Sequence, residues 1–595
     1  MRKVVGDIEA DGLYDDVTQI WCAVFKDVRE NTLHTFTPAN IRELPSFLDS
    51  VGALIMHNGA RYDLPVIEKI LGYRFEGCLL DTLAISRMER SKRFAHSLDS
   101  WGITLDFPKQ EYSDWSQYSS RMLEYCKNDV ELTHRVAKHL GCIREDIPVR
   151  HRVISSLFKN LFHQEENGWR VDVRHLDRSI AWLSRWMDRI GRVTEPQLPR
   201  IVEVGTELSS PFKRDGNPSK LTEKYCAQAE IATDWIGGPF HRVSFRTVSL
   251  DRPSEVKQLL LELGWIPEEW NYDKTGKRTS PKLSVTDSFE GVESRLGKVA
   301  AKYTQCKQRR AILLGWQKAL RADGRLPSKV SGLAVTSRAR HSVIANIPRN
   351  TSFFGRQMRR VFVAREGWVL VGADAESCQL RMLAARMGDE EYIRRVCTED
   401  VHSVNQSIAE IDDRTDAKIL IYALIFGASN ARLTRMLGKE GAPIRAALMN
   451  NLPALKQLIR EVETLWKATA KTRLNKWGRI EYYDGHVEGL DGRIIPVNSA
   501  HKILMGLLQS DEAILMQYAY NLYWNKLLRA GFVSGVDFGV CCWYHDEIQS
   551  EARPEIAKEV GRMKCDSIVQ AGQYLGIACP MAGSYKIGDN WSETH

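Results

Sequence analysis

The sequence lacks the features that would place the chain in a membrane, a secretory compartment or a repeat architecture. No apolar run reaches the roughly 20 residues needed to span a bilayer. No leader-like apolar stretch follows the first residues, Met-Arg-Lys, and no internal repeat is visible. The 12 cysteines do not show the paired spacing of a metal site. We therefore expect free thiols in a reducing compartment and no membrane partner.

Length and charge favour several domains and a polyanionic partner. A chain of 595 residues exceeds what one ordinary hydrophobic core organises, so we expect three or four domains. The net charge of +8 and the pI near 8.8 suit a protein that meets nucleic acid over part of its surface. A metabolic enzyme could have the same balance, so these values agree with the interpretation without deciding it.

One segment combines cationic side chains with a predicted helix. Asp412-Asp413 are candidate N-caps and Gly427 is a candidate stop. Arg414, Lys418 and Tyr422 recur at four-residue steps, so at about 100° per residue they span only roughly 80° of the circumference. An Arg fork and a Lys point charge on one face suit the oxygens of a polyphosphate. A solvated helix edge above a packed aromatic ring would show the same spacing.

Two apolar stretches of strand length end in acidic residues. The run 368–373 leads into Asp374, and the run 540–544 leads into His545-Asp546-Glu547 with a returning strand behind it. The second stretch is therefore predicted to be a hairpin with acids at its tip. Two such tips side by side can hold a pair of Mg²⁺ ions about 3.5–4 Å apart, as in-line phosphoryl transfer requires. Acidic turns are common, so the joint pattern around the cationic helix carries more weight than either tip.

The amino-terminal part carries a second set of acids. Asp7 and Glu9 lie two apart on a predicted strand and so point to one face. Asp63 enters a helix after a second strand and turn, and Tyr125 and Asp129 lie four apart on a helix predicted over 121–140. Four carboxylates and a tyrosine from three elements could converge on two metal ions. A lone Asp-x-Glu is more often structural, so this hypothesis depends on the whole set.

In their order along the chain, these segments resemble a known family. The residues at 7–9, 57–63 and 125–129 resemble the three motifs of a 3′-5′ exonuclease of the DEDD class, tyrosine subtype. The residues at 374–381, 414–427 and 545–547 resemble motifs A, B and C of family A DNA polymerases. From residue 7 to the C-terminus, the chain is similar to a family A DNA polymerase of the compact bacteriophage replicase type with an attached proofreading domain.

The resemblance implies an α/β multidomain fold, with a ribonuclease H-like exonuclease domain and a right-hand polymerase of thumb, palm and fingers. It implies an exonuclease domain at 1–145, a thumb with a short insertion at 150–325, palm segments at 326–384 and 500–595, and fingers at 385–499. Some phage relatives recruit a processivity protein through a large thumb insertion. The insertion here is too short for a full version, so we expect no such partner.

The resemblance also implies a role for each site residue. Asp374 and Asp546 would bind metal, with Glu547 beside them as a catalytic residue. The implied nucleotide contacts are Arg414, Lys418, Tyr422, His402, Gln379 and Phe426, and the implied DNA contacts are Arg338, Gln509, His545, Lys302 and Arg309. In the exonuclease half, the implied metal ligands are Asp7, Glu9, Asp63 and Asp129, with Tyr125 as the catalytic residue that orients the attacking water.

Each implied site would use two Mg²⁺ ions, for which Mn²⁺ can substitute. The implied partners are primer-template DNA, deoxynucleoside triphosphates (dNTPs) and other replisome proteins, such as a helicase-primase and a single-strand binding protein. The enzyme would be a monomer that copies phage DNA in the cytoplasm of a bacterial host. Two alternatives stay open: a single-subunit RNA polymerase relative, which the amino-terminal acids disfavour, and a nuclease-dominant DNA-binding repair protein, which the pair Asp374 and Asp546 disfavours.

Several positions depart from the family pattern. Gln379 stands where motif A usually has a Glu that helps exclude the ribose 2′-hydroxyl, so it keeps the length and loses the charge. Ser337 replaces a usual Gly and Met505 a common Asn, and both changes bear on inspection of the minor groove. Phe426 keeps the ring of a frequent Tyr without its hydroxyl.

Overall fold

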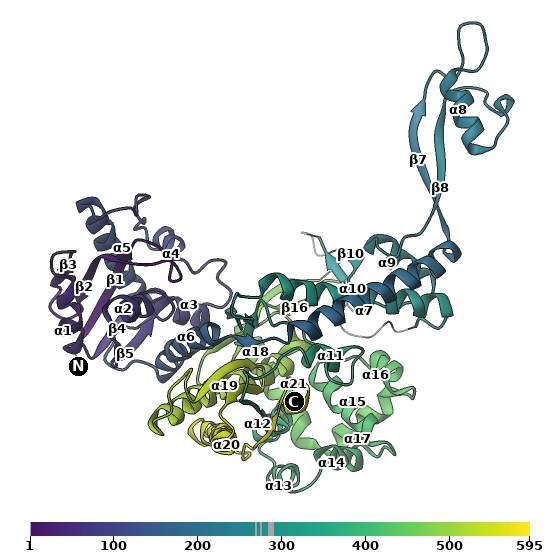
Figure 1. Ribbon diagram of the computed structural model, residues 1–595. Coiled ribbons are helices and arrows are strands. Elements are labelled where there is room, and N and C mark those ends of the chain that lie inside the picture. Colours follow the sequence, from purple (N-terminus) through teal and green to yellow (C-terminus); the bar gives the residue numbers. More distant parts are fainter. Residues whose placement is uncertain (1, 268–269, 274–276, 284–288, 290, 476) are drawn as a thin grey trace. The chain divides into compact units, whose positions relative to one another are not determined.

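A computed structural model describes residues 2–267, 270–273, 277–283, 289, 291–475 and 477–595, and the chain forms two compact units. The first comprises Met1–Val171, Arg321–Ala345 and Phe362–His595, and the second comprises Asp172–Leu320 and Asn346–Val361. Helices and strands are abundant in the chain, so the expected α/β multidomain class is confirmed (Figure 1). Within the described ranges, no helix is both long and apolar enough to cross a membrane.

The amino-terminal part of the first unit contains a five-stranded mixed sheet in the order β3-β2-β1-β4-β5. The strands are β1 (Lys3–Ala10), β2 (Ile20–Asp27), β3 (Leu33–Phe36), β4 (Ala53–Met56) and β5 (Cys78–Asp81). β1 pairs antiparallel with β2 and parallel with β4. Val4, Val5, Leu54 and Ile55 are fully buried, as expected for central strands that helices cover on both faces.

Helices border this sheet, and one of them carries two predicted site residues. The helices are α1 (Leu44–Asp49), α2 (Asp63–Leu71), α3 (Thr82–Glu89), α4 (Leu98–Thr104) and α5 (Ser120–His139). The Ser119 side chain caps α5 by accepting from the N–H of Met122. α5 contacts β1 and β2, and both Tyr125 and Asp129 are buried on it. The next helix, α6 (Val149–Asn167), leads toward the rest of the first unit.

The carboxyl-terminal part of the first unit contains a four-stranded antiparallel sheet in the order β19-β20-β14-β21. The strands are β14 (Val369–Ala375), β19 (Phe538–Tyr544), β20 (Glu547–Ala552) and β21 (Gly583–Gly588). The predicted strand before Asp374 and the predicted hairpin around Asp546 are therefore confirmed. Helix α20 (Ala557–Tyr574) packs on β14, and the long helix α19 (Ile503–Arg529) packs on α20.

Between β14 and α19 the chain is mainly helical. The helices are α12 (Cys378–Met387), α13 (Glu390–Thr398), α14 (Val401–Ala409), α15 (Arg414–Ile425), α16 (Asn430–Leu437), α17 (Gly441–Asn451) and α18 (Pro453–Thr469). Two hairpins follow, β15 (Lys471–Leu474) with β16 (Ile480–Tyr483) and β17 (Gly485–Glu488) with β18 (Ile494–Val497). The predicted cationic helix is α15: Asp413 caps it, and Gly427 follows it with φ of 70°.

The second unit is built on two long helices, α7 (Val173–Thr194) and α10 (Arg295–Ala319), which pack on each other. Leu176, Leu183 and Met187 on α7 are buried. The unit also contains α9 (Pro253–Glu262), α11 (Gly355–Arg359) and the short strands β9 (Trp270–Tyr272) and β10 (Arg278–Pro281). The hairpin of β7 (Arg200–Leu208) and β8 (Phe240–Thr247) carries α8 (Lys220–Ala229) and projects from these helices (Figure 1).

Candidate functional site

Strand pairing in the four-stranded sheet brings together acids from distant parts of the sequence. Asp374 on β14 lies opposite Glu547 on β20. The backbone N–H of Ala375 donates to the carbonyl oxygen of Asp546 at 3.0 Å. The three predicted polymerase acids therefore lie together where neighbouring strands of one sheet end, and we call this row of strand ends the acidic edge of the sheet.

A strained two-residue loop holds Asp546 at the tip of its hairpin. Tyr544 pairs with Glu547, so His545 and Asp546 alone form the loop, and His545 has φ of 61°. This left-handed conformation costs a residue with a side chain about 1–2 kcal/mol. The indole Nε1 of Trp543 donates to the His545 carbonyl oxygen at 2.8 Å and so supports the turn. Strain of this kind is concentrated at functional sites in proteins.

The acids at this edge oppose one another electrostatically. The Asp374 side chain is open to solvent, yet incomplete hydration and repulsion from Glu547 raise its pKa to about 6. Burial, followed by repulsion from Glu512 and Asp374, raises the pKa of Asp546 well above its ordinary value. A bound cation would offset this repulsion, and carboxylate oxygens are the ligands that hard divalent ions prefer. The donor set therefore fits a divalent metal.

Glu547 is held more firmly than its two neighbours. Its Oε1 accepts from the indole Nε1 of Trp591 at 2.7 Å and from the amide of Gln549. Its Oε2 contacts Nδ1 of His595 at 2.8 Å. With 2% of its surface exposed and both oxygens engaged, Glu547 shapes the site beside the two aspartates.

A fourth carboxylate, Glu512, was missed by sequence reasoning. It lies on α19 three residues after Gln509, and its Oε1 accepts from Nη2 of Arg338 at 2.6 Å. Its Oε2 accepts from Nε2 of Gln379 at 2.7 Å. The available signal was an acidic pair, Asp511 and Glu512, inside a long and otherwise mainly apolar helix.

The cationic helix has its own acidic partner, which the sequence did not identify. Asp400 accepts two hydrogen bonds from the Arg414 guanidinium, both at 2.7 Å. The rings of His402 and Tyr422 lie 6.2 Å apart. Burial, then the charges of Lys418 and Arg414, lower the pKa of His402. The predicted phosphate-binding residues are thus neighbours, and Asp400 occupies the Nε and Nη2 side of the Arg414 guanidinium.

The other predicted DNA and nucleotide contacts are dispersed. In the first unit, Gln509 is half-buried on α19, and 45% of the Phe426 surface is exposed after α15. Ser337 has φ of 63°, the left-handed conformation that glycine adopts most easily, which agrees with the Gly that the resemblance leads one to expect there. In the second unit, Lys302 lies over the ring of Phe353 at 3.3 Å, and Arg309 is buried with 2% exposure.

The predicted amino-terminal acids also converge. Ligand atoms of Asp7, Glu9 and Cys126 lie within 4.8 Å of one another, and the Oδ1 atom of Asp63 accepts from the N–H of Ile8 at 3.3 Å. Burial and repulsion from Asp129 raise the pKa of Glu9 to about 9, and burial raises that of Asp63 to about 7. Mutual repulsion and buried carboxylates again fit a divalent cation.

Two further features of this amino-terminal site stand out. Asp129 keeps its Oδ1 buried with no hydrogen-bond partner among the described residues, although its Oδ2 pairs with Lys109 Nζ at 2.5 Å. Lys109 also lies 4.9 Å from the centre of the Tyr125 ring. Lys109 was not predicted, because it comes from an irregular segment between α4 and α5 that carries no recognisable motif.

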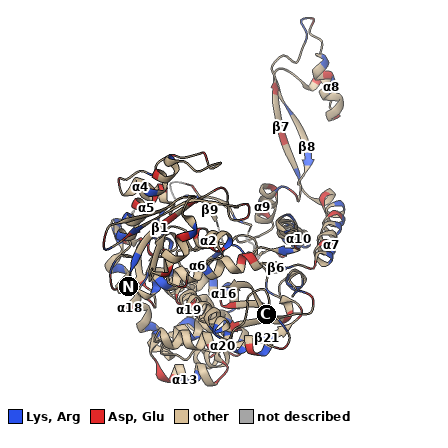
Figure 2. Ribbon diagram, turned by 60° about the vertical axis from the view of Figure 1, so that its left-hand side comes forward, with Lys and Arg blue, Asp and Glu red and all other residues tan. Residues whose placement is uncertain are grey.

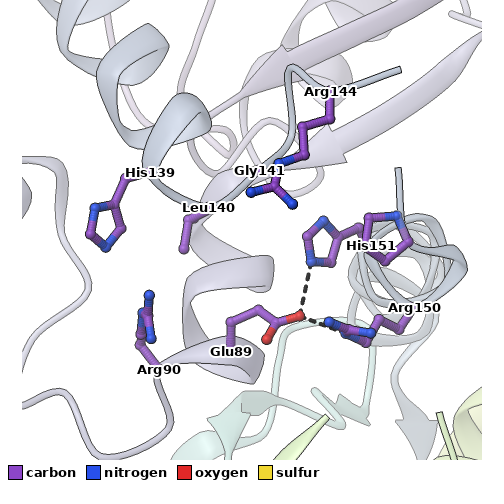
Figure 3. A pocket seen from close by; sticks show the side chains of 9 residues that line it. Glu89, Arg90, His139, Leu140, Gly141, Arg144, Arg150 and His151 are labelled. Atoms are coloured by element: carbon purple, nitrogen blue, oxygen red, sulfur yellow. Dashed lines mark hydrogen bonds and ion pairs between the residues drawn. The ribbon is translucent and has the colours of Figure 1, made fainter. Parts of the chain in front are cut away.

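A cavity of about 170 Å³ lies elsewhere in the first unit. Its lining consists of Glu89, Arg90, His139, Leu140, Gly141, Arg144, Pro148, Arg150 and His151. Figure 3 shows Glu89 contacting both Arg150 and His151, at 2.6 and 2.9 Å. None of the predicted site residues contributes to this lining, so the cavity is separate from both acidic clusters.

Comparison with known proteins identifies the family. A family model described as "DNA polymerase family A" matches residues 238–593. The chain belongs to DNA polymerase family A. The matched range includes Asp374, the cationic helix and Asp546, so the resemblance inferred from the motifs and the expected DNA-directed DNA polymerase activity are confirmed. The match also decides against a single-subunit RNA polymerase.

Relatives cover the whole polymerase chain. The DNA-directed DNA polymerases of Enterobacteria phage T3 and Escherichia phage T7 are 26% and 25% identical to it, each over 100% of both chains. DNA polymerase I of Pseudomonas aeruginosa is 24% identical, over 94% of this chain and 58% of the relative. A solved structure, the POL domain of Pol1 from M. smegmatis in complex with DNA primer-template and dNTP, has the same fold. Its TM-score is 0.70 at 15% identity, with 99% and 95% of the two chains covered.

The raised carboxylate pKa values predict how metal removal affects stability. A folded-state pKa raised from the ordinary 4.5 to about 9, as for Glu9, gives stability that is lost as the pH rises through that window. In a chelator, the melting temperature should therefore fall between about pH 6 and pH 9. Divalent ions bind the ionised carboxylates, so Mg²⁺ or Mn²⁺ should raise the melting temperature by roughly 5 °C at the higher pH and less at the lower.

Differential scanning calorimetry with and without metal measures this effect. The matched control is Glu9→Gln, which removes one buried charge and should both weaken the pH dependence and reduce the response to metal. If the melting temperature is the same with and without metal at every pH, the assignment of the two acidic clusters as cation sites is contradicted.

Proposed function

We propose that this polymerase adds deoxynucleotides to a primer at the edge formed by Asp374 and Asp546, and trims the primer 3′ end at the cluster of Asp7, Glu9, Asp63 and Asp129. The observation that carries the first assignment is the pairing of β14 with β20, which places the acids beside one another. The second assignment is supported by the convergence of buried carboxylates from β1, α2 and α5.

In the polymerase site, Asp374 and Asp546 would hold two divalent ions, Mg²⁺ with Mn²⁺ as a substitute. When bound, such ions activate the primer 3′-hydroxyl and neutralise charge on the departing pyrophosphate. Glu547, anchored by Trp591 and His595, keeps the edge of the sheet in place. Each aspartate needs its charged form for this role, and cation binding lowers the raised pKa values that burial and repulsion cause.

The triphosphate would lie against α15. Arg414 and Lys418 supply the fork and the point charge, and Tyr422 with His402 supplies an aromatic surface for the base and sugar. The bidentate Asp400 pair orients the Arg414 guanidinium. A triphosphate has more negative charge than one carboxylate, so it competes effectively for the same guanidinium.

In the exonuclease site, the four carboxylates would hold the metals, and Tyr125 would orient the attacking water. Lys109 bridges the two parts of this arrangement, because it pairs with Asp129 and lies beside the Tyr125 ring. Its positive charge also offsets repulsion among the acids. A frayed primer end reaches such a site more easily, because unpairing costs a few kcal/mol less at a mismatch.

We assign the amino-terminal sheet to the exonuclease domain, the β14–β20 sheet to the palm and the helices around α15 to the fingers. The second compact unit corresponds to the thumb, with bounds of 172–320 and 346–361 compared with the expected 150–325. The phage DNA-directed DNA polymerases support a phage replicase, and the solved structure supports primer-template DNA and dNTPs as its substrates. We further propose that it works in the cytoplasm of a bacterial host beside other replisome proteins.

The thumb offers a better phosphate-binding surface than the buried Arg309. Both charge signs occur along α7 in Figure 2, but its arginines are aligned. At about 100° and 1.5 Å per residue, they fall within roughly 60° of the circumference over roughly 27 Å. The members of this stripe are Arg174, Arg178, Arg185, Arg189 and Arg192, all of them exposed. Among the described residues no carboxylate pairs with any of them, so the stripe is available to a DNA backbone.

Separate carboxylate sets predict separable activities. Asp546→Ala should abolish primer extension and leave 3′-5′ degradation, and Asp7→Ala should abolish degradation and leave extension. A 5′-labelled primer-template incubated with and without dNTPs measures both. The isosteric Asp546→Asn and Asp7→Asn control for packing. Loss of both activities in one folded variant would refute the two-site assignment.

The α7 stripe predicts a change in the salt dependence of DNA binding. The slope of log K against log salt is negative, and each lost phosphate contact reduces its magnitude by about 0.9, so Arg185→Gln with Arg189→Gln should make it less steep by about 2. Fluorescence anisotropy with duplex primer-template over a KCl series gives the slope. Lys558→Gln with Arg562→Gln, the same charge change at the same spacing on α20, should leave it unchanged. Equal slopes for the two double variants would remove the stripe from the DNA-binding surface.

A further inference from the structure

Glu512 joins three separate elements of the polymerase site. It lies in the middle of α19 and is 2% exposed. One oxygen accepts from Arg338, in the loop between β12 (Val330–Leu333) and β13 (Ala339–His341), and the other accepts from Gln379 at the start of α12. Each oxygen has a donor from a different element, so Glu512 fixes the positions of both Arg338 and Gln379.

A carboxylate at this place is energetically costly. Glu512 is among the charges that raise the pKa of both Asp374 and Asp546, so it adds repulsion to an edge that is already acidic. A buried charge persists when it is paired and hydrogen-bonded, and Arg338 provides the opposing charge. Residues that oppose local stability in this way are common in functional sites.

The Glu512 carboxylate also fixes the orientation of the Gln379 side-chain amide. A carboxylate can only accept hydrogen bonds, so the NH₂ group of Gln379 must turn toward Glu512. The carbonyl oxygen Oε1 is left on the opposite side of the amide. An unanchored glutamine would sample several rotamers, whereas the 2.7 Å hydrogen bond restricts this one.

We propose that Glu512 is the anchor for sugar selection in this polymerase. It supplies from α19 the negative charge that motif A lacks at Gln379, and it holds the Gln379 side chain where the sugar of the incoming nucleotide lies. This inference rests on the proposed assignment of Asp374 and Asp546 as the polymerase centre. A restrained Gln379 fills the space that a ribose 2′-hydroxyl needs, so a ribonucleotide meets a side chain that cannot move aside.

Because Arg338 and Gln379 share the Glu512 carboxylate, the contact to the primer end and the contact to the nucleotide sugar are coupled. Arg338, the expected contact to the primer end, and Gln379, the expected contact to the sugar, are supported by the same group. The Nε atom of Arg338 is buried without a hydrogen-bond partner among the described residues, so the Glu512 carboxylate is the group that holds this guanidinium. Glu512 is thus a positioning residue for both contacts.

Substitutions of Glu512 and Gln379 distinguish the effect of the hydrogen bond between them from the effect of side-chain size. Glu512→Ala frees Gln379, so the ratio of kcat/KM for a dNTP to that for the matching ribonucleotide should fall about tenfold, the value of one hydrogen bond. Glu512→Gln should shift the ratio in the same direction, because a glutamine can donate and lets the Gln379 amide turn over. Gln379→Glu alone places two carboxylates in contact and should depress dNTP addition.

The decisive variant is the exchange of the two side chains. Gln379→Glu combined with Glu512→Gln restores one carboxylate and one amide in contact, so the ratio should return to within about threefold of the unaltered enzyme. The matched control is Asp511→Asn, which removes a neighbouring buried carboxylate that pairs with Arg386 and does not touch Gln379. It should leave the ratio unchanged even where it lowers the melting temperature.

Single-nucleotide primer extension by the full chain, with a dNTP and its matching ribonucleotide, measures every ratio, and thermal melting confirms folding. If Glu512→Ala does not fold, Glu512→Gln and the exchange variant decide the outcome. The role of Glu512 is overturned if Glu512→Gln leaves the ratio of kcat/KM for dNTP to ribonucleotide unchanged. It is also overturned if the exchange variant does not restore that ratio. Extension by Asp546→Ala would instead overturn the underlying site assignment, so the two failures are distinguishable.

Discussion

The antiparallel pairing of β14 with β20 is the constraint on which the proposed polymerase site depends. Side chains alternate across a sheet, so a slip of one residue would move Asp374 to the opposite face. Lys564 stabilises this register from α20, because its buried ammonium donates to carbonyl oxygens of both strands, those of Val371 and Ile548. Burial lowers the pKa of Lys564 to about 7. The strand ends that carry Asp374 and Glu547 are thus supported from within the fold.

In both acidic clusters, carboxylates lie close enough together to repel one another. Each concentrates carboxylates whose repulsion and incomplete hydration raise their pKa values. Each also includes a cationic side chain that pairs with one of its carboxylates, Lys109 with Asp129 in one and Arg338 with Glu512 in the other. One positive charge offsets only part of the repulsion among several acids. The remaining negative charge is what favours divalent ions over a self-contained network of ion pairs.

Gln379, which replaces the Glu expected in motif A, must be interpreted together with the residues that it contacts. The resemblance alone indicates a lost charge at the position that checks the nucleotide sugar. In the fold, a carboxylate from α19 contacts the Gln379 amide, so the charge is present beside that position on a different element. At Ser337, by contrast, the backbone keeps the left-handed conformation that suits glycine and accepts a hydrogen bond from Gln517. At both places the fold of this chain provides what the resemblance leads one to expect, a negative charge near Gln379 and a left-handed backbone at Ser337, although the residues differ.

The amino-acid sequence by itself determined the elements and most of the acids. Apolar runs predicted β1, β14 and the hairpin of β19 with β20, helical spacing and caps predicted α15, and the ordered motifs identified the family. Local signals suffice here because strands, caps and turns depend on neighbouring residues. Only the tertiary structure decided that Glu512, Lys109 and Asp400 contact the predicted site residues and that Arg309 is buried. Those contacts join elements that are distant along the chain, and the burial and charge that make them matter exist only after the elements have packed.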